Sequence, residues 1–346
     1  MTKVLVTGGA GFIGTRLVAA LVAHAHEVQV VDNLHSQVHG EPTGHVLGPR
    51  DHVLHPMDVR SADSWTALLR VFQPEVIFHL AAETGTGQSL HEASRHASVN
   101  VLGTTEMLDA LARTGVRPDS LVLTSSRAVY GEGDWTLPDG RNVSPGPRTA
   151  AMLEAGTWDP LGPNGERLVP APNVAGQTPA CPTNIYAATK LAQEHLLLAW
   201  GSAMGVKIRI RRLQNVFGAG QALGNPYTGV LTYFARLASK REVIPLYEDG
   251  AIVRDFVHVG TVVDALLDAL TGDVELADVG SGEVTYLCDV ADAIARRAGA
   301  PPPVITGQYR LGDVRAAGAS DITSRRGLAS FELHLEELLG WASAAR

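Results

Sequence analysis

Two side chains spaced four residues apart could form an acid–base pair. They lie in Tyr186-Ala187-Ala188-Thr189-Lys190, which opens a stretch with apolar residues at helical spacing. On an α-helix this spacing places the phenol and the ammonium on one face, one turn apart. A phenolate could take the proton of a hydroxyl group, but a free phenol has a pKa of ~10, so nearby positive charge is needed to favour the anion. Such a pair is usually only a surface pair, and its meaning depends on the groups around it.

A hydroxyl group at Ser126 is the second candidate. Residues 121–126 read Leu-Val-Leu-Thr-Ser-Ser and predict a buried strand that ends in hydroxyls. Ser126 could hold a substrate oxygen while Tyr186 removes its proton. Between Gly131 and Tyr186 the chain is rich in Gly, Pro and Asn, with little periodicity. We expect this stretch to be an active-site cover or a surface insertion.

A glycine-rich turn follows the first expected strand, residues 3–7. The turn reads Gly8-Gly9-Ala10-Gly11-Phe12-Ile13-Gly14 and runs into an amphipathic helix. Glycines at this spacing let backbone amides approach a pyrophosphate at the N-terminus of that helix. The pattern predicts a dinucleotide-binding βα unit.

An acid ends the next expected strand, Val28-Gln29-Val30-Val31-Asp32. Asp32 is expected where the adenosine ribose presents its 2′- and 3′-hydroxyls. A carboxylate there accepts hydrogen bonds from a diol and repels a 2′-phosphate. The sequence therefore favours NAD over NADP. Asp58, at the end of a third short strand, could meet the adenine amino group, and the small Ala81 and Ala82 would let the cofactor lie close.

Strands and helices alternate along the first part of the chain. Further expected elements are a helix from Ser61 to Phe72 with Ser61 as N-cap, a strand over 74–82, a helix over 100–112 and a strand over 206–213. We predict an α/β fold, a Rossmann-type doubly wound parallel sheet with a smaller C-terminal substrate-binding lobe. The expected NAD-binding domain is 1–213, with the insertion at about 132–180 and a segment at about 255–280 returning to it. Residues 214–346 would mainly form the lobe.

Composition excludes several classes of partner. The chain has 346 residues and a net charge of −8, without the basic stripe that nucleic-acid binding needs. No basic n-region with a cleavable apolar core and no run of membrane-spanning length occurs, so we expect a cytoplasmic protein without a membrane partner.

No metal is expected. Cys181 and Cys288 lie too far apart to suggest a disulfide framework or a zinc site. His35, His39 and His45, in a region expected to be a loop, lack regular ligand spacing. The stretch from Gly131 to Ala180 contains neither cysteine nor histidine, so it should be free of structural zinc.

Polar segments could bind a nucleotide sugar. The loop over 83–89 follows the carboxyl end of the expected fourth strand, where open α/β sheets bind ligands, and it suits a sugar's hydroxyls. Residues 214–218 are expected to form a turn. Arg254 and Arg310 are expected in turns beside strands, and two arginines from separate segments suit a nucleotide diphosphate.

Together these motifs resemble the extended short-chain dehydrogenase/reductase family, in particular its NAD-dependent nucleotide-sugar epimerases and dehydratases. The matching segments, in chain order, are 7–14, Asp32-Asn33, Asp58-Val59-Arg60, His79-Leu80-Ala81-Ala82, Ser125-Ser126, Val129-Tyr130-Gly131, 186–190, Asn215-Val216-Phe217-Gly218 and Arg254-Asp255-Phe256-Val257. They cover nearly the whole chain.

The resemblance assigns roles to individual residues. It implies that Ser126 is the catalytic hydroxyl, Tyr186 the general base and Lys190 the activating lysine. The implied cofactor contacts are Gly8, Gly11, Phe12, Ile13, Gly14, Asp32, Asn33, Asp58, Val59, Leu80, Ala81, Ala82, Asn100, Tyr186 and Lys190. The expected substrate contacts are Glu83, Thr84, Ser126, Arg127, Asn215, Asn225, Arg254, Arg310 and Asp313. The family usually forms homodimers through the helices that contain Asn100 and Tyr186.

The residues after Ser126 narrow the activity. Dehydratases of the family place an Asp-Glu pair there, and this chain has Arg127 and Ala128, which cannot act as that acid and base. A narrower resemblance is to the dTDP-L-rhamnose 4-epimerase subgroup, through residues 82–89, 125–127, 225–229, 309–313 and the long insertion. Members of that subgroup often carry cysteine pairs in the insertion, and this chain departs from them there.

The resemblance implies an NAD-dependent 4-epimerase that oxidises its nucleotide sugar transiently, with dTDP-L-rhamnose as the expected substrate. A 4-ketoreductase would use the same Ser126, Tyr186 and Lys190 but would release oxidised cofactor at each turnover. An epimerase of another nucleotide sugar, such as a UDP-hexose, is a further alternative. A non-catalytic dinucleotide-binding regulator would be expected to have lost these residues, and all of them are present.

Overall fold

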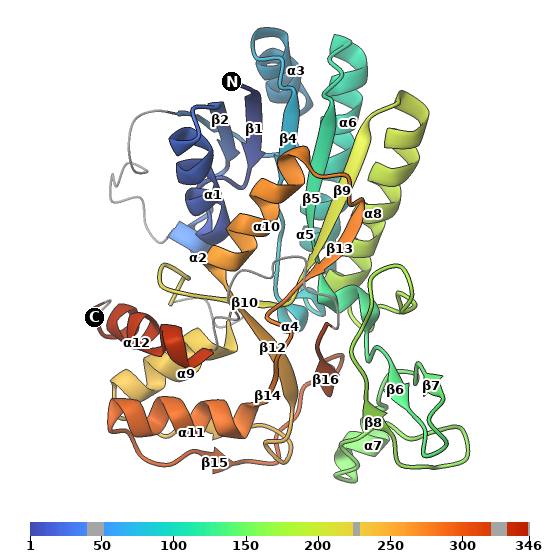
Figure 1. Ribbon diagram of the computed structural model, residues 1–346, viewed down its shortest axis with the longest axis vertical. Helices are drawn as coiled ribbons and strands as arrows, with labels where there is room; N and C mark the ends of the chain where they lie inside the picture. Colours follow the sequence, from blue (N-terminus) through green and yellow to red (C-terminus); the bar gives the residue numbers. More distant parts are fainter. Residues whose placement is uncertain (40–51, 224–228, 320–330, 345–346) are drawn as a thin grey trace.

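A parallel sheet of seven strands forms the upper part of the molecule in the computed structural model, which describes residues 1–39, 52–223, 229–319 and 331–344 (Figure 1). The strand order is β13-β9-β5-β4-β1-β2-β3. The strands are β1 (Lys3–Thr7), β2 (Glu27–Asp32), β3 (Val53–Pro56), β4 (Val76–His79), β5 (Ser120–Ser126), β9 (Lys207–Leu213) and β13 (Leu276–Val279). The reversal of strand order between β1 and β4 is the arrangement of a dinucleotide-binding fold, and it confirms the predicted fold class.

Helices cover both faces of this sheet. They are α1 (Phe12–Ala23), α3 (Ala62–Val71), α6 (Gly103–Thr114), α8 (Ile185–Met204) and α10 (Val259–Thr271). On β1, Leu5 packs into the core beneath α3, α6 and α8, whereas Val4 and Val6 pack beneath α1 and α10. Both faces of the strand are buried, which explains its continuous apolar run.

Side-chain caps fix the N-terminal ends of α3 and α8. Ser61 accepts a hydrogen bond from the Ser64 amide at the start of α3, as predicted. Asn184, the N-cap of α8, accepts one from the Ala187 amide, and the first residue of the helix, Ile185, directly precedes Tyr186. Tyr186 therefore lies in the first turn of a long helix.

A second lobe lies below the sheet in Figure 1. Its mixed sheet joins β10 (Asn215–Phe217), β12 (Val253–His258) and β14 (Val284–Tyr286), with β16 (Ala316–Ala317) beside β12. The strands β11 (Pro245–Leu246) and β15 (Val304–Ile305) form a separate pair. The lobe's core lies among α9 (Val230–Ser239), α11 (Leu287–Ala298), the 3₁₀ turn Phe331–His334 and α12 (Leu335–Ala344).

The insertion has its own small structure. Three short strands, β6 (Trp135–Thr136), β7 (Asn142–Val143) and β8 (Val169–Pro170), form a sheet beside α7 (Ala150–Glu154). Trp135, Leu137 and Leu168 pack against Val253 and Ala316 of the second lobe. The insertion, expected as an active-site cover or a surface insertion, thus has secondary structure of its own.

Other elements differ from the expectation. Residues 215–217, expected in a turn, form the strand β10, because they pair with β12. The expected loop after Asp32 contains a short helix, α2 (Ser36–His39), and His45 lies outside the described residues. The helix expected from Asn100 is preceded by α4 (Thr86–Ser89), α5 (Ala93–Ala97) and a π-helical turn, Ser98–Leu102, that contains Asn100. A 3₁₀ turn, Arg127–Tyr130, follows β5.

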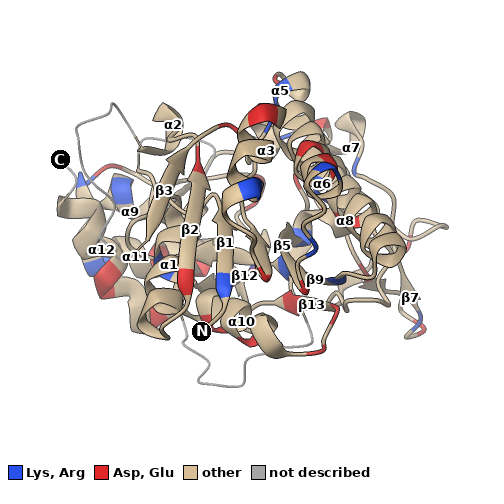
Figure 2. Ribbon diagram, turned by 90° about the horizontal axis from the view of Figure 1, so that it is seen from above, with Lys and Arg blue, Asp and Glu red and all other residues tan. Residues whose placement is uncertain are grey.

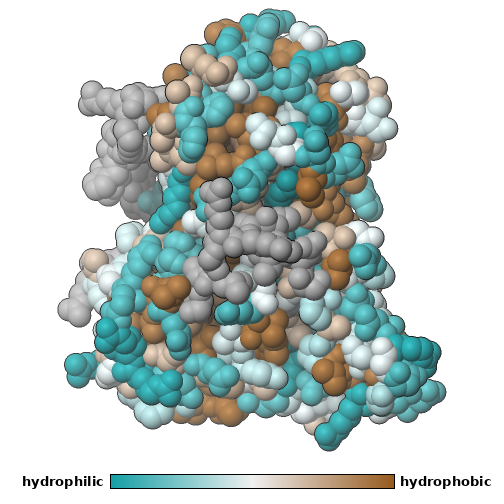
Figure 3. Space-filling view, in the orientation of Figure 1, coloured by the Kyte–Doolittle hydropathy of each residue, from teal (hydrophilic) through white to brown (hydrophobic). Residues whose placement is uncertain are grey.

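The surface carries charges of both signs. Basic and acidic residues are interspersed over the ribbon in Figure 2. On the face drawn in Figure 3, hydrophobic side chains form separate patches between hydrophilic ones. Among the described helices, none has the length and apolar character needed to cross a membrane.

Candidate active site

The glycine turn forms a tight cradle between β1 and α1. Gly8 has a φ of +68°, and a Cβ added there would lie 2.7 Å from the Ala81 amide nitrogen. A Cβ on Gly14 would lie 2.2 Å from the Gly8 carbonyl oxygen. Only glycine fits these two positions, which bring the start of α1 close to the ends of β1 and β4. The cradle fits the pyrophosphate of a dinucleotide.

Asp32 ends β2 with both carboxylate oxygens held in place. Oδ2 accepts a hydrogen bond from the Ala10 amide at 3.0 Å, and Oδ1 accepts one from the Leu34 amide at 2.9 Å. The His39 ring lies 3.6 Å from Oδ1. The carboxylate is therefore fixed beside the glycine turn, as a ribose-binding acid must be.

Cofactor preference should depend on Asp32. We expect Asp32→Ala to narrow the difference between the NAD and NADP dissociation constants by roughly tenfold, because the repulsion of a 2′-phosphate is lost along with the hydrogen bonds to a diol. Titration of the wild type and the variant with both cofactors measures this. Equal affinity of the wild type for NAD and NADP would contradict the assignment.

Two other expected cofactor contacts are engaged within the chain. The Asp58 carboxylate accepts hydrogen bonds from the Arg60 guanidinium, the shorter at 2.6 Å, and these lower the pKa of Asp58. The buried Asn100 side chain bonds to both the amide and the carbonyl of Glu83 and donates to Thr189. Asn100 thus fixes the start of the loop that follows β4 and ties it to α8.

Ser126 and Tyr186 come together where β5 meets α8. Ser126 accepts a hydrogen bond from the Ala128 amide at 3.1 Å, and its hydroxyl is hydrogen-bonded to the Tyr186 phenol. Burial raises the pKa of Tyr186 above its usual value, while the bond to Ser126 and the charge of Arg127 oppose that rise. The two groups are placed to act on one hydroxyl group.

The expected role of Lys190 as the lysine that activates Tyr186 stays a prediction, and the structure shows the surroundings of both groups. The cation whose charge lowers the pKa of Tyr186 is Arg127, which follows Ser126. The buried Lys190 ammonium instead donates to Gln193 Oε1 at 2.6 Å. On a helix the residues three and four positions away are both neighbours, so the spacing could not decide which one the ammonium would meet.

A cluster of charges lies next to the reaction centre. Arg254 donates to Asp313 Oδ1 at 3.0 Å, and the charges of Arg254 and Arg127 lower the pKa of Asp313. Burial, with Arg254 nearby, lowers the pKa of Arg127 to about 10. The charges of two arginines act on one carboxylate, so the cluster has positive charge to offer an anionic ligand.

The two arginines expected to bind the diphosphate, Arg254 and Arg310, lie in different surroundings. Arg254 lies within β12 rather than in a turn, because residues 253–255 pair with β14. Arg310 is exposed, with its guanidinium over the Tyr247 ring. The other arginine whose charge acts on Asp313 is Arg127.

The remaining expected substrate contacts differ in their surroundings. Glu83 forms an ion pair with Arg95 at 2.9 Å, and the Thr84 carbonyl faces the His96 ring. The side-chain oxygen of Asn215 is buried without a hydrogen-bond partner among the described residues, as a ligand-binding group would be. Asn225 lies outside the described residues.

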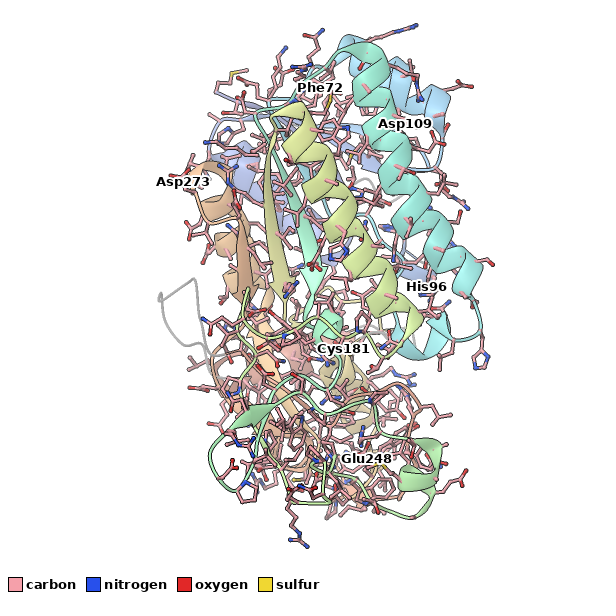
Figure 4. All side chains as sticks on the ribbon, turned by 90° about the vertical axis from the view of Figure 1, so that its right-hand side faces the viewer. Phe72, His96, Asp109, Cys181, Glu248 and Asp273 are labelled. Carbon is pink, nitrogen blue, oxygen red and sulfur yellow. The ribbon has the colours of Figure 1, made fainter. Side chains whose placement is uncertain are left out.

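A buried network of four charges connects the insertion to this site, and the sequence reasoning missed it. Arg148 of the insertion donates to Glu132 at 2.9 Å and to Glu248 at 2.8 Å, and Arg315 pairs with Glu248 at 2.9 Å. Arg148 also donates to the Asp313 carbonyl at 3.0 Å. Figure 4 labels Glu248 within the lower lobe. No local signal marks Arg148, because its partners lie far away in the sequence.

His258, His334 and Glu337 form a cluster of the kind that can bind metals. The two rings are stacked with centroids 3.6 Å apart, and His258 Nδ1 accepts a hydrogen bond from the Gly260 amide. The neutral ring therefore carries its proton on Nε2, which faces Glu337 at 3.4 Å. A proton on Nε2 and parallel rings both oppose binding of one ion, so the cluster fits a polar packing contact between β12 and α12 better.

Comparisons with known proteins agree with this geometry. The sequence model of the family described as "NAD dependent epimerase/dehydratase family" matches residues 4–279. A dTDP-L-rhamnose 4-epimerase of Burkholderia thailandensis is 48% identical over 98% of this chain and 94% of its own length. A UDP-glucose 4-epimerase of Mycolicibacterium smegmatis is 30% identical over 98% of this chain and 93% of its own length.

Solved structures show the same fold over almost the whole chain. The UDP-glucose 4-epimerase of Thermus thermophilus in complex with NAD has a TM-score of 0.75 and 28% identity and covers 99% of both chains. The Thermotoga maritima UDP-glucose 4-epimerase with UDP-glucose has a TM-score of 0.75 and 26% identity, over 98% of this chain and 97% of that one.

Proposed function

The chain belongs to the NAD-dependent epimerase/dehydratase family, and we propose that it is a nucleotide-sugar 4-epimerase that converts dTDP-L-rhamnose to dTDP-6-deoxy-L-talose. The observation that carries the proposal is the joining of Ser126 and Tyr186 beside the cradle of a dinucleotide. The near full-length similarity to a dTDP-L-rhamnose 4-epimerase supports the choice of sugar.

NAD would be held by the glycine turn, by Asp32 and by the strand ends near Ala81. When bound, it supplies the acceptor for a hydride from the sugar carbon and its donor on the return. The remaining cofactor contacts expected from the family stay part of the proposal, namely Phe12, Ile13, Asn33, Asp58, Val59, Leu80, Ala82, Asn100 and Lys190.

In this proposal Tyr186 takes the proton of the sugar hydroxyl and later returns it. Ser126 keeps the same oxygen in place through its hydrogen bond. The intermediate ketone is planar at its carbon. When the ketone presents its opposite face before the hydride returns, the configuration at that carbon is inverted. Arg127 provides the nearby positive charge that favours the Tyr186 phenolate.

Carbon 4 is preferred because its hydroxyl needs only Ser126, Tyr186 and NAD. Inversion at carbon 3 or 5 through a ketone would require a further acid and base. Cys181 is an exposed thiol five positions before Tyr186, and Figure 4 labels it near the lower end of α8. Within the described part of the chain no side chain forms a hydrogen bond or ion pair with this thiol, so we assign it no such role.

The charged cluster would receive the nucleotide diphosphate. Arg254 is the proposed phosphate ligand, with Arg127 close to both that group and the sugar. Asn215 and Asp313 would contribute polar contacts, and Arg310 is retained as an outer contact from the exposed loop.

We also propose a homodimer through the helices containing Asn100 and Tyr186, a cytoplasmic location and the domain division at about residue 213.

Product analysis by NMR tests the proposal. Incubation with dTDP-L-rhamnose should give a mixture with its 4-epimer, without net consumption of NAD or NADH. UDP-glucose, the substrate named for a relative, serves as the alternative sugar. Conversion of UDP-glucose alone would favour a UDP-hexose epimerase, and stoichiometric use of reduced cofactor on a 4-keto sugar would favour a ketoreductase.

A further inference from the structure

Gln193 contacts the ammonium of Lys190 inside the protein. Its Oε1 accepts a hydrogen bond from Nζ at 2.6 Å, and both side chains are almost completely buried. A buried ammonium without an acceptor is strongly disfavoured, so this amide oxygen matters to the lysine more than a surface contact would.

The Gln193 amide is held in one orientation by hydrogen bonds on the side that faces away from Lys190. The Thr104 hydroxyl donates to the Asn100 carbonyl at 2.6 Å, so its oxygen can only accept from Gln193 Nε2 at 2.9 Å and from His79 Nε2 at 3.0 Å. His79 Nδ1 then accepts from the Thr7 hydroxyl at 2.8 Å. With its nitrogen bound to Thr104, the Gln193 amide must present its oxygen to Lys190.

This network reaches the proposed cofactor site at both ends. The Thr7 hydroxyl oxygen accepts from the Ala81 amide at 3.1 Å, at the ends of β1 and β4. The Asn100 carbonyl lies in the π-helical turn that fixes the loop after β4. The direction of the Lys190 ammonium is therefore linked to the strands that would carry the cofactor.

Other charges also face Lys190. Glu194 on α8 raises its pKa, and Glu194 is itself bound by Arg212 of β9 at 2.7 Å. The His79 ring of β4 is neutral, since burial and the Lys190 charge lower its pKa to about 3. Tyr186 lies one turn before Lys190 on α8. Burial dominates, and the pKa of Lys190 is lowered to about 7.

We propose that Gln193 is a positioning residue whose amide oxygen holds the Lys190 ammonium in the direction and charge state in which it binds NAD. This rests on the proposed function, in which Lys190 contacts the cofactor. The ammonium form is fully present well below the pKa of Lys190 and is lost as the pH rises through it. NAD affinity should therefore fall as the pH rises through about 7.

NAD binding without any sugar tests the proposal, so its outcome is independent of the substrate. We would measure the NAD dissociation constant from pH 5.5 to 8.5 for the wild type, Gln193→Met and Gln193→Glu. Methionine removes the acceptor at similar volume, and the midpoint of the affinity loss should move down by about one pH unit. Glutamate keeps an oxygen acceptor and adds a negative charge, so the midpoint should move up.

Thr232→Val is the matched control, because Thr232 is a buried hydroxyl on α9 with a hydrogen bond to Gln221. It should lower the melting temperature slightly and leave the pH midpoint unchanged. A merely structural role for Gln193 would lower the melting temperature of both Gln193 variants without moving their midpoints apart. That result, or a wild-type affinity that does not change with pH, would overturn the proposal.

Discussion

Tyr186→Phe should reduce turnover by ~10²-fold or more while NAD binding stays close to that of the wild type. Tyr186 lies at the start of α8. The substitution removes only its ionisable oxygen, which is hydrogen-bonded to Ser126. The phenyl ring keeps its place in the packing, so neither the fold nor the glycine turn should change. Steady-state rates with dTDP-L-rhamnose and a direct NAD titration measure the two quantities separately.

Ser126→Ala is the companion variant to Tyr186→Phe. It removes the hydroxyl that positions the substrate oxygen and should also slow turnover with little effect on NAD affinity. Near-normal turnover of the phenylalanine variant would mean that another group takes the proton. In that case the assignment of Tyr186 as the base would fail.

Arg148→Met should destabilise the protein by about 3–5 kcal/mol. The substitution leaves Glu132 and Glu248 buried with one cation fewer, and the side chains of all three are at most 2% exposed. It also removes the donor to the Asp313 carbonyl, so KM for the nucleotide sugar should rise. Equilibrium unfolding in urea gives the stability, and initial rates give KM.

Arg141→Gln is the control within the same insertion. Arg141 pairs with Asp139 at the surface, where its side chain is 75% exposed, and such a pair contributes about 0–1 kcal/mol. Equal, small losses for the two variants would show that the insertion is held to the lobe by its apolar contacts alone.

Local patterns were sufficient to predict most of the fold. The glycine turn with Asp32, the N-cap Ser61 and the apolar runs of β1 and β5 each depend on neighbouring residues, and the structure has them where the sequence indicated. The strand β10 was missed because its pairing with β12 joins residues about 40 positions apart. The short strands of the insertion were not predicted, since each is only two residues long and shows no period.

The positions of site residues could be predicted where those residues lie on a regular helix or at the end of a strand. The spacing placed Tyr186 on α8, and the end of β5 placed Ser126 beside it. The direction of the Lys190 side chain depends on Gln193 and on a network that reaches β1. The contact of Arg148 with Asp313 spans 165 positions. Burial and long-range pairing determine such contacts, and neither is visible in one sequence.

The central claim is that a hydride leaves carbon 4 of dTDP-L-rhamnose and returns to the same carbon. Running the reaction in deuterated water tests this most directly, with the product examined by NMR and mass spectrometry. We expect the 4-epimer without deuterium on the sugar ring, because a hydride held on the cofactor does not exchange with solvent. Deuterium incorporated at a ring carbon would show that a proton is abstracted from carbon, and it would contradict this account.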